Sequence, residues 1–154
     1  MSATDKTTFG FLVTDVTRLM RKHFDRRAVR FQLTRAQWRA LKRLHYSEGL
    51  TQNELAEFLE MEPIAVGRVI DRLQKAGFIE RRADPRDRRV WRLHLLPKAH
   101  AVVDDMEQIA SDLLRKAQRG IAAVEVKSMI SVLARMKDNL NALDDADGTP
   151  GESS

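Results

Sequence analysis

Two short amphipathic helices joined by only three residues constrain the fold of this chain more than any other feature. Thr51 and Glu54 form a capping box, in which both side chains accept hydrogen bonds from backbone N–H groups at a helix start, and Thr34 and Gln37 form another at the start of the preceding helix. Pro63 suits the first turn of the next helix, where the N–H that proline lacks would have no partner. Residues 60–62 form a tight connection between the two. This spacing is typical of a helix-turn-helix.

The second helix of the pair divides into a buried and an exposed face. Val66, Val69, Ile70 and Leu73 recur at three- and four-residue steps, which is the period of a stripe that faces a core. Gly77 ends the helix as a C-cap. With the apolar stripe inward, the outward face holds Ile64, Arg68, Asp71 and Lys75, flanked by Gly67 and Arg72.

A change of period after this helix indicates a β-hairpin. Every second residue from 91 to 95 is apolar, as in a half-buried strand. We predict strands over residues 78–82 and 89–95. The loop over residues 83–88 holds turn residues and charges but no apolar anchor, so it should project into solvent. A helix-turn-helix followed by such a hairpin predicts a winged helix-turn-helix.

Arginine is concentrated in the hairpin. Six arginines fall within twelve residues, against two aspartates, Asp84 and Asp87: Arg81, Arg82, Arg86, Arg88, Arg89 and Arg92. Arginine is less strongly hydrated than lysine and fits the narrow minor groove of A·T-rich DNA, where the potential is most negative. The net charge of +5 for the whole chain also favours a polyanionic partner. The alternative is a merely basic surface loop.

Double-stranded DNA is therefore the predicted partner, with the helix in the major groove and the wing in the minor groove. Arg68 can donate two hydrogen bonds to guanine, and Ile64 can touch a thymine methyl group. The remaining predicted DNA contacts are Thr51, Gln52, Gly67, Arg72, Lys75, Arg86, Arg88 and Arg89, most of them to phosphate. The alternative for the helix is a charged face that meets only solvent.

Several other classes of protein are excluded or not expected. The chain has no cysteine, which excludes disulfides, thiolate zinc sites and thiol redox sensing. Its four histidines lack metal-ligand spacing, so no metal is expected. We see no nucleophile with a base, no convergent carboxylates and no glycine-rich phosphate loop, so we expect neither an enzyme nor a cofactor. No apolar run reaches the roughly 20 residues of a membrane helix, and the N-terminus lacks a signal peptide, so we expect a cytoplasmic protein.

The segments named above resemble the MarR (multiple antibiotic resistance) family of regulators. Residues 69–81, VIDRLQKAGFIER, and 84–89, DPRDRR, are similar to the recognition helix and wing of that family. Residues 33–38 and 50–56 are similar to the starts of its second and third helices. The resemblance covers nearly the whole ordered chain. It departs at residues 96–99, where a threonine-capped helix start is usual in the family.

The resemblance assigns roles to three charged residues. It implies that Arg89 enters the minor groove and that Asp71 and Asp87 orient the arginines of the wing. An arginine held by a carboxylate loses less side-chain freedom on binding. Asp71 is therefore better explained as a brace than as a base reader, since a lone aspartate facing DNA would repel phosphate.

The family dimerises through its first and last helices, which fits an apolar surplus in this chain. Helical stripes of apolar residues run through 8–30 and through the region after Pro97, more than one winged helix can cover. We predict a mainly α fold with an N-terminal dimerisation helix (1–32), a winged helix-turn-helix (33–96), C-terminal dimerisation helices (97–144) and a disordered acidic tail (145–154). A homodimer predicts a pseudo-palindromic operator. The alternative is an intramolecular three-helix core.

The resemblance also implies a ligand. Many relatives respond to small aromatic acids, and several bind them with two arginines of the first helix and a tryptophan of the second, which Arg18, Arg21 and Trp38 match. Guanidinium groups can hold a carboxylate while an indole stacks on a ring. The prediction is a ligand-responsive transcription regulator that acts as a homodimeric repressor. The chief rival is a winged-helix module that binds protein without specific DNA binding.

Overall fold

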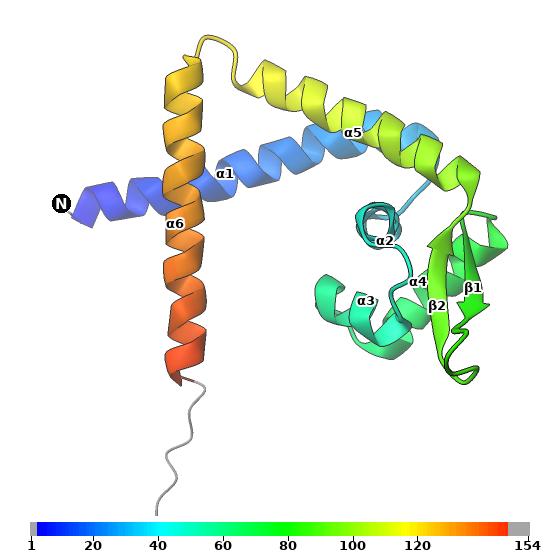
Figure 1. Cartoon of the computed structure of the whole chain (residues 1–154). Coiled ribbons are helices and arrows are strands. Elements are labelled where there is room, and N and C mark those ends of the chain that lie inside the picture. The colour runs from blue at the N-terminus through cyan, green and yellow to red at the C-terminus, as the bar shows by residue number, and fades with distance from the viewer. Residues whose placement is uncertain (1–2, 148–154) are drawn as a thin grey trace, which may run out of the picture. The chain divides into compact units, whose positions relative to one another are not determined.

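The computed structural model describes residues 3–147 of the chain and the side chains of residues 8–144. It divides after Leu114 into two compact units. The elements, in order, are α1 (Ala3–Ala28), η1 (Val29–Phe31), α2 (Arg35–Tyr46), α3 (Gln52–Leu59), α4 (Pro63–Lys75), β1 (Ile79–Ala83), β2 (Trp91–Leu95), α5 (Pro97–Ala117) and α6 (Ala123–Asp147) (Figure 1). The predicted mainly α fold with a β-hairpin wing is confirmed.

Both predicted capping boxes are present. At the start of α2 the Gln37 N–H donates to the Thr34 hydroxyl (3.2 Å), and the Thr34 N–H donates to the Gln37 side chain (2.9 Å). At the start of α3 the Glu54 N–H donates to the Thr51 hydroxyl (3.3 Å), and the Thr51 N–H donates to the Glu54 carboxylate (2.8 Å). These reciprocal bonds fix where the two helices begin, because they satisfy N–H groups that have no partner inside the helix.

Helix α4 is delimited as the sequence predicts. Pro63 occupies its first turn. At its other end Gly77 has a φ of 78°, and the N–H of Phe78 donates to the carbonyl of Leu73 (2.9 Å), which is a Schellman cap. The turn before α4 places Glu60 in the left-handed region with a φ of 54°. The core between α2, α3 and α4 is made of fully buried aliphatic side chains: Leu41, Leu44, Leu55, Leu59, Val66, Ile70 and Leu73.

Strands β1 and β2 form an antiparallel hairpin in which Ile79 pairs with Leu95 and Ala83 pairs with Trp91. Backbone hydrogen bonds of 2.9 Å join Leu93 to Gly49 and Leu50, so the loop before α3 extends the sheet. Trp91 departs from the predicted alternation: Leu93 and Leu95 are buried, but Trp91 is 54% exposed. It lies at the end of β2 nearest the loop, beyond the core, and its partner across the hairpin is the small residue Ala83.

In the same unit, α1 and α5 contribute to the core at one end each. Phe24 of α1 stacks on Trp38 of α2 with ring centroids 5.9 Å apart, and Met106 and Val103 of α5 are buried in the same core. Helix α1 is longer than the predicted 8–30 at its start and ends in a 3-10 turn. Helix α5 begins at Pro97, where the Lys98 ammonium donates to the carbonyl of Ala76.

The second unit consists of the end of α5, a turn and α6. The N–H of Ala122 donates to the Glu125 carboxylate (3.0 Å) just before α6 begins. This helix continues to Asp147, three residues into the segment predicted as a disordered tail, whereas residues 148–154 of that tail lie outside the described residues. Over residues 3–147, no helix is both long and apolar enough to cross a membrane.

Candidate nucleic-acid interface

The predicted reading face of α4 is open to solvent. Ile64 is 74% exposed, and Arg68, Asp71, Arg72 and Lys75 are all exposed, while Val66, Ile70 and Leu73 are buried on the opposite side. The exposed side of α4 therefore combines one apolar and several hydrogen-bonding groups that can face a duplex.

Gly67 and Gln52 hold α3 and α4 close together. The Gln52 amide donates a 2.9 Å hydrogen bond to the carbonyl of Pro63, and a Cβ atom built on Gly67 would lie 2.9 Å from the same amide nitrogen. Any side chain at position 67 would therefore displace Gln52. This contact explains Gly67 by the close approach of α3. Contact of either residue with DNA stays a prediction.

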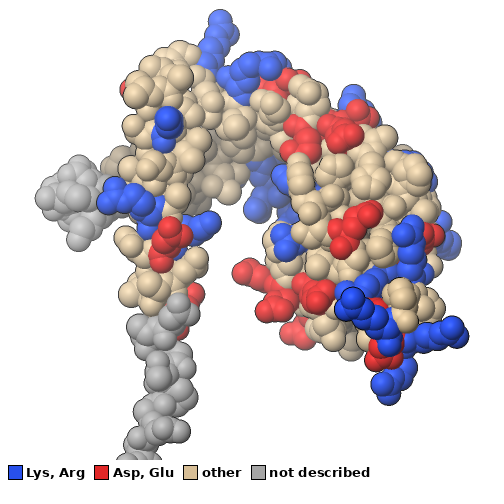
Figure 2. Space-filling view, in the orientation of Figure 1, with Lys and Arg blue, Asp and Glu red and all other residues tan. Residues whose placement is uncertain are grey.

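The wing is joined to α4 through Arg81. Its guanidinium donates to the Asp71 carboxylate at 2.7 Å and also to the Gln74 side chain. Asp71 is thus paired across the space between the reading helix and the hairpin, the geometry expected of a brace. Figure 2 shows lysine and arginine side chains gathered over the hairpin.

The tip of the wing presents Arg89. Its side chain is 91% exposed, although both its backbone N–H (3.1 Å) and its Nε (3.2 Å) donate to the Asp87 carboxylate. Arg86 and Arg88 on the same loop are exposed as well. Asp87 therefore orients Arg89 while leaving its guanidinium open to a partner.

Arg92 has a different role, which the sequence interpretation missed. Its Nε donates to the Asp84 carboxylate (2.6 Å) and its Nη1 to the carbonyl of Gly49 (2.8 Å). Asp84 is only 8% exposed, and hydrogen bonds from the Arg86 N–H (2.8 Å) and from Arg92 hold the pKa of its carboxyl below the usual range. Arg92 thus fastens the wing to the loop before α3. An aspartate followed by proline is a turn signal that could have identified Asp84 as structural.

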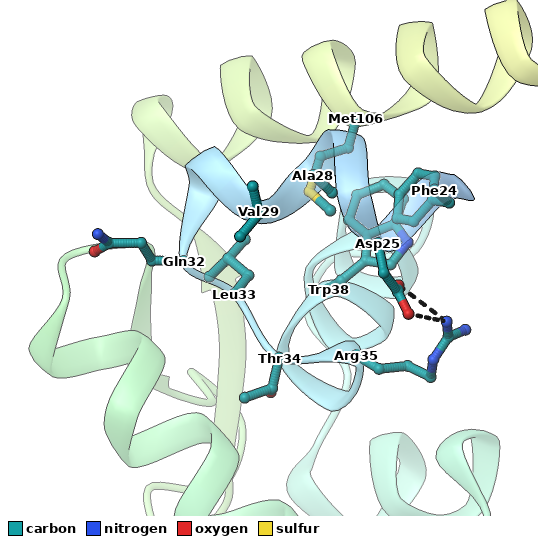
Figure 3. A pocket seen from close by; sticks show the side chains of 10 residues that line it. All are labelled: Phe24, Asp25, Ala28, Val29, Gln32, Leu33, Thr34, Arg35, Trp38 and Met106. Atoms are coloured by element: carbon teal, nitrogen blue, oxygen red, sulfur yellow. Dashed lines mark hydrogen bonds and ion pairs between the residues drawn. The ribbon is translucent and has the colours of Figure 1, made fainter. Parts of the chain in front are cut away.

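Two cavities lie between α1, α2 and α5 within the first unit. One, of about 400 Å³, is lined by Arg21, Lys42, Arg35, Trp38 and apolar residues that include Met20 and Leu113. The other, of about 320 Å³, shares Phe24, Arg35 and Trp38 with it, and Figure 3 shows Asp25 and Arg35 facing each other at its edge (3.1 Å).

Two of the three predicted effector residues line a cavity, and the third does not. Arg21 and Trp38 line the larger cavity, and Trp38 lines both. Arg18 pairs instead with Asp15 at 3.2 Å and lines neither cavity. Among the described side chains, no group of three or more potential ligands could hold a metal ion.

Known proteins resemble this chain in both sequence and fold. The family model described as MarR family matches residues 33–91. The crystal structure of the transcriptional regulator PA3341 has 32% sequence identity and a TM-score of 0.74, over 87% of this chain and 98% of that one. The chain belongs to the MarR family.

Two other MarR-like structures show the same fold. The reduced form of MarR from E. coli has 24% identity and a TM-score of 0.72, over 82% of this chain and 94% of that one. MepR, a transcription regulator of the Staphylococcus aureus multidrug efflux pump MepA, has 22% identity and a TM-score of 0.73, over 86% of this chain and 98% of that one. As a MarR-family member, this protein is a DNA-binding transcription regulator and not an enzyme.

Proposed function

We propose that this MarR-family protein is a homodimeric repressor that binds a pseudo-palindromic operator and releases it when a small aromatic acid binds. The observation that carries the proposal is the ion pair between Asp71 and Arg81, because it ties the hairpin to the helix that bears Arg68. Two cationic elements held in this way can enter neighbouring grooves of one duplex. Since the target is chromosomal DNA, the proposal places the protein in the cytoplasm.

In the proposed complex α4 lies in the major groove and the wing in the minor groove. Arg68 donates to a guanine and Ile64 contacts a thymine methyl group. Arg89 enters the minor groove, where an exposed guanidinium oriented by a carboxylate is favoured. Phosphate contacts come from the other basic or polar groups: Thr51, Gln52, Arg72, Lys75, Arg86 and Arg88.

The homodimer is supported by exposed apolar side chains on the two terminal helices. On α1 these include Phe9, Phe11, Leu12 and Val16, all between 47% and 66% exposed. On α6, considered separately, they include Val124, Met129, Ile130, Leu133, Leu140 and Leu143. Large apolar side chains left exposed in such number on one helix are typical of an interaction site. A two-fold dimer places its half-sites about one helical turn, roughly 34–36 Å, apart.

The DNA-binding part of the proposal is tested by selecting duplexes from a random pool and measuring their affinity at several salt concentrations. We expect enrichment of inverted repeats and an affinity that falls steeply with salt, because several phosphates lose counterions on binding. Light scattering of the free protein should give the mass of two chains. A monomer, or affinity that is independent of both salt and sequence, would refute this part.

The aromatic-acid part rests on the larger cavity, where Arg21 and Trp38 meet. A carboxylate can pair with Arg21 while an aromatic ring stacks on the indole. A panel of benzoates at about a hundredfold excess over the dissociation constant should add about 2.7 kcal/mol of stability in thermal unfolding. Benzyl alcohol, which lacks the charge, is the control ligand.

Two matched variants make this test specific to the cavity. Arg21→Ala should abolish the thermal shift, whereas Arg18→Ala should retain it, because Arg18 pairs with Asp15 outside both cavities. The bound acid should also lower operator affinity, since it favours a dimer whose two reading heads no longer match the operator. A stabilising acid that leaves operator affinity unchanged would show that the cavity binds ligands without regulating DNA binding.

A further inference from the structure

Trp91 is an exposed indole at the base of the wing that the DNA contacts described so far leave unused. It is 54% exposed, whereas the only other tryptophan, Trp38, is 9% exposed and packs in the core. Single exposed apolar residues are common on protein surfaces. The surroundings of Trp91 therefore matter more than its exposure.

The hairpin register determines which way Trp91 faces. Leu93 and Leu95 lie on the same face of β2 as Trp91, since side chains alternate along a strand, and both are buried against the helices. Arg81 also lies on this inner face, opposite Leu93, and it reaches Asp71 of α4. Trp91 thus continues the helix-facing side of the hairpin outward, past the point where the core ends.

The indole lines a cavity of about 310 Å³ between the wing and the start of α3. Residues 51–53 form one side of the cavity, and Arg81 and Arg89 line it with Trp91 from the hairpin. None of its described lining residues is acidic. Asp71 and Asp87, which pair with the two arginines, lie outside it. The cavity therefore combines two guanidinium groups, neutral hydrogen-bonding side chains and one aromatic ring.

The position of the cavity indicates its occupant. Gln52 lines the cavity and bonds to the carbonyl of Pro63, so one wall of the cavity, the start of α3, is tied to the start of the reading helix, and the wing forms the other wall. Adjacent major and minor grooves are separated by a single sugar–phosphate backbone. A duplex that receives α4 in one groove and the wing tip in the next must pass that backbone between them.

We propose that Trp91 is a DNA-positioning residue, whose indole packs against the sugar–phosphate backbone that crosses between α4 and the wing. This inference rests on the proposed mode of DNA binding. Arg81 attracts phosphate, the ring covers the apolar face of a deoxyribose, and the indole N–H, which can only donate, suits a phosphate oxygen. A backbone contact carries no sequence information, so Trp91 supports specific and non-specific duplexes equally.

The first test compares Trp91→Ala with Tyr46→Ala, which truncates another aromatic residue that is 65% exposed and lines none of the cavities described above. Fluorescence anisotropy should show Trp91→Ala binding operator and random duplex about tenfold more weakly, with the salt slope of the parent, because the ring is uncharged. Tyr46→Ala should bind as the parent does. Thermal unfolding checks that both variants are folded.

The second test needs no truncated protein. Tryptophan fluorescence of the parent should become protected from acrylamide when duplex is added, and Trp91→Phe, which retains only Trp38, should lack that change. Unchanged quenching in the parent together with parent-like affinity of Trp91→Ala would overturn the proposal while leaving DNA binding intact. If the parent itself binds no duplex, the proposed function fails first. A salt slope that falls in Trp91→Ala would also overturn it, since displacement of the wing arginines would then explain the loss.

Discussion

In the proposed complex the reading helix and the wing contact one duplex, but their side chains are positioned in different ways. In α4, burial of Val66, Ile70 and Leu73 decides which residues point outward, because the helical period fixes all other directions. In the wing, arginines that are close neighbours in sequence have separate partners: Arg81 pairs with Asp71 of α4, Arg92 with the carbonyl of Gly49, and the exposed Arg89 with Asp87 of its own loop. Periodicity orders the helix, whereas specific ion pairs order the wing.

The largest effect is expected in α4, where substitution of Arg68 distinguishes a base contact from a contact with the DNA backbone. Arg68→Ala should weaken operator binding by about 10- to 100-fold, because a bidentate contact to guanine discriminates by roughly 1–3 kcal/mol. Binding to random duplex should stay unchanged. Anisotropy titrations on both duplexes measure this. Equal losses on the two duplexes would instead make Arg68 a phosphate contact.

A smaller effect is expected at the wing tip, and it should have a different character. Arg89→Ala should weaken binding to both duplexes by about tenfold and reduce the salt slope by about one, because one cationic contact is lost. Arg82→Ala is the matched control. Arg82 pairs with Glu80 and lies on the opposite face of the hairpin from Trp91, so affinity should not change. Equal loss in both variants would mean that net charge matters and position does not.

The brace between the two elements should have a few-fold effect. Asp71→Asn should weaken operator binding about two- to threefold, because Arg81 loses a surface ion pair that holds the wing near α4. The opposite sign is expected if Asp71 merely repels phosphate, since removal of its charge would then tighten binding. A double-mutant cycle with Arg81→Ala measures the coupling directly.

The smallest effect concerns acid sensitivity at the base of the wing. The pKa of Asp84 is lowered in the folded protein, so its ionised form stabilises the fold above the ordinary aspartate value of about 3.9, and this contribution is lost as the pH falls through the lowered pKa. Asp84→Asn should melt a few degrees lower than the parent at pH 7. The gap should close as pH falls below the ordinary value. A gap that is constant down to pH 2 would mean that the carboxylate charge is not what stabilises the wing.

The sequence predicted well where the helices of the DNA-binding unit begin and end. Both capping boxes, Pro63 in the first turn of α4 and Gly77 after its end depend on residues within a few positions of each other, so a local pattern suffices to find them. The outward residues of α4 follow from the same period.

The wing and the cavities could not be predicted to the same depth. The partner of Arg92 is a carbonyl 43 positions earlier, and the exposure of Trp91 depends on Ala83 across the hairpin. Arg18 and Arg21 look equivalent on a helical wheel, but only Arg21 borders a cavity, since that cavity is formed by three helices. Such contacts join distant parts of the chain, and no local spacing encodes them.

Helix α4 is anchored at both ends through backbone groups, by the hydrogen bond from Gln52 to the carbonyl of Pro63 and by the left-handed Gly77. Neither anchor uses an outward side chain, so Ile64, Arg68 and Lys75 can be exchanged without shifting the helix along its axis. In the proposed mode of binding, a change of operator therefore needs only point substitutions on this face. Grafting the outward residues of a relative onto α4 is correspondingly a direct route to a retargeted regulator.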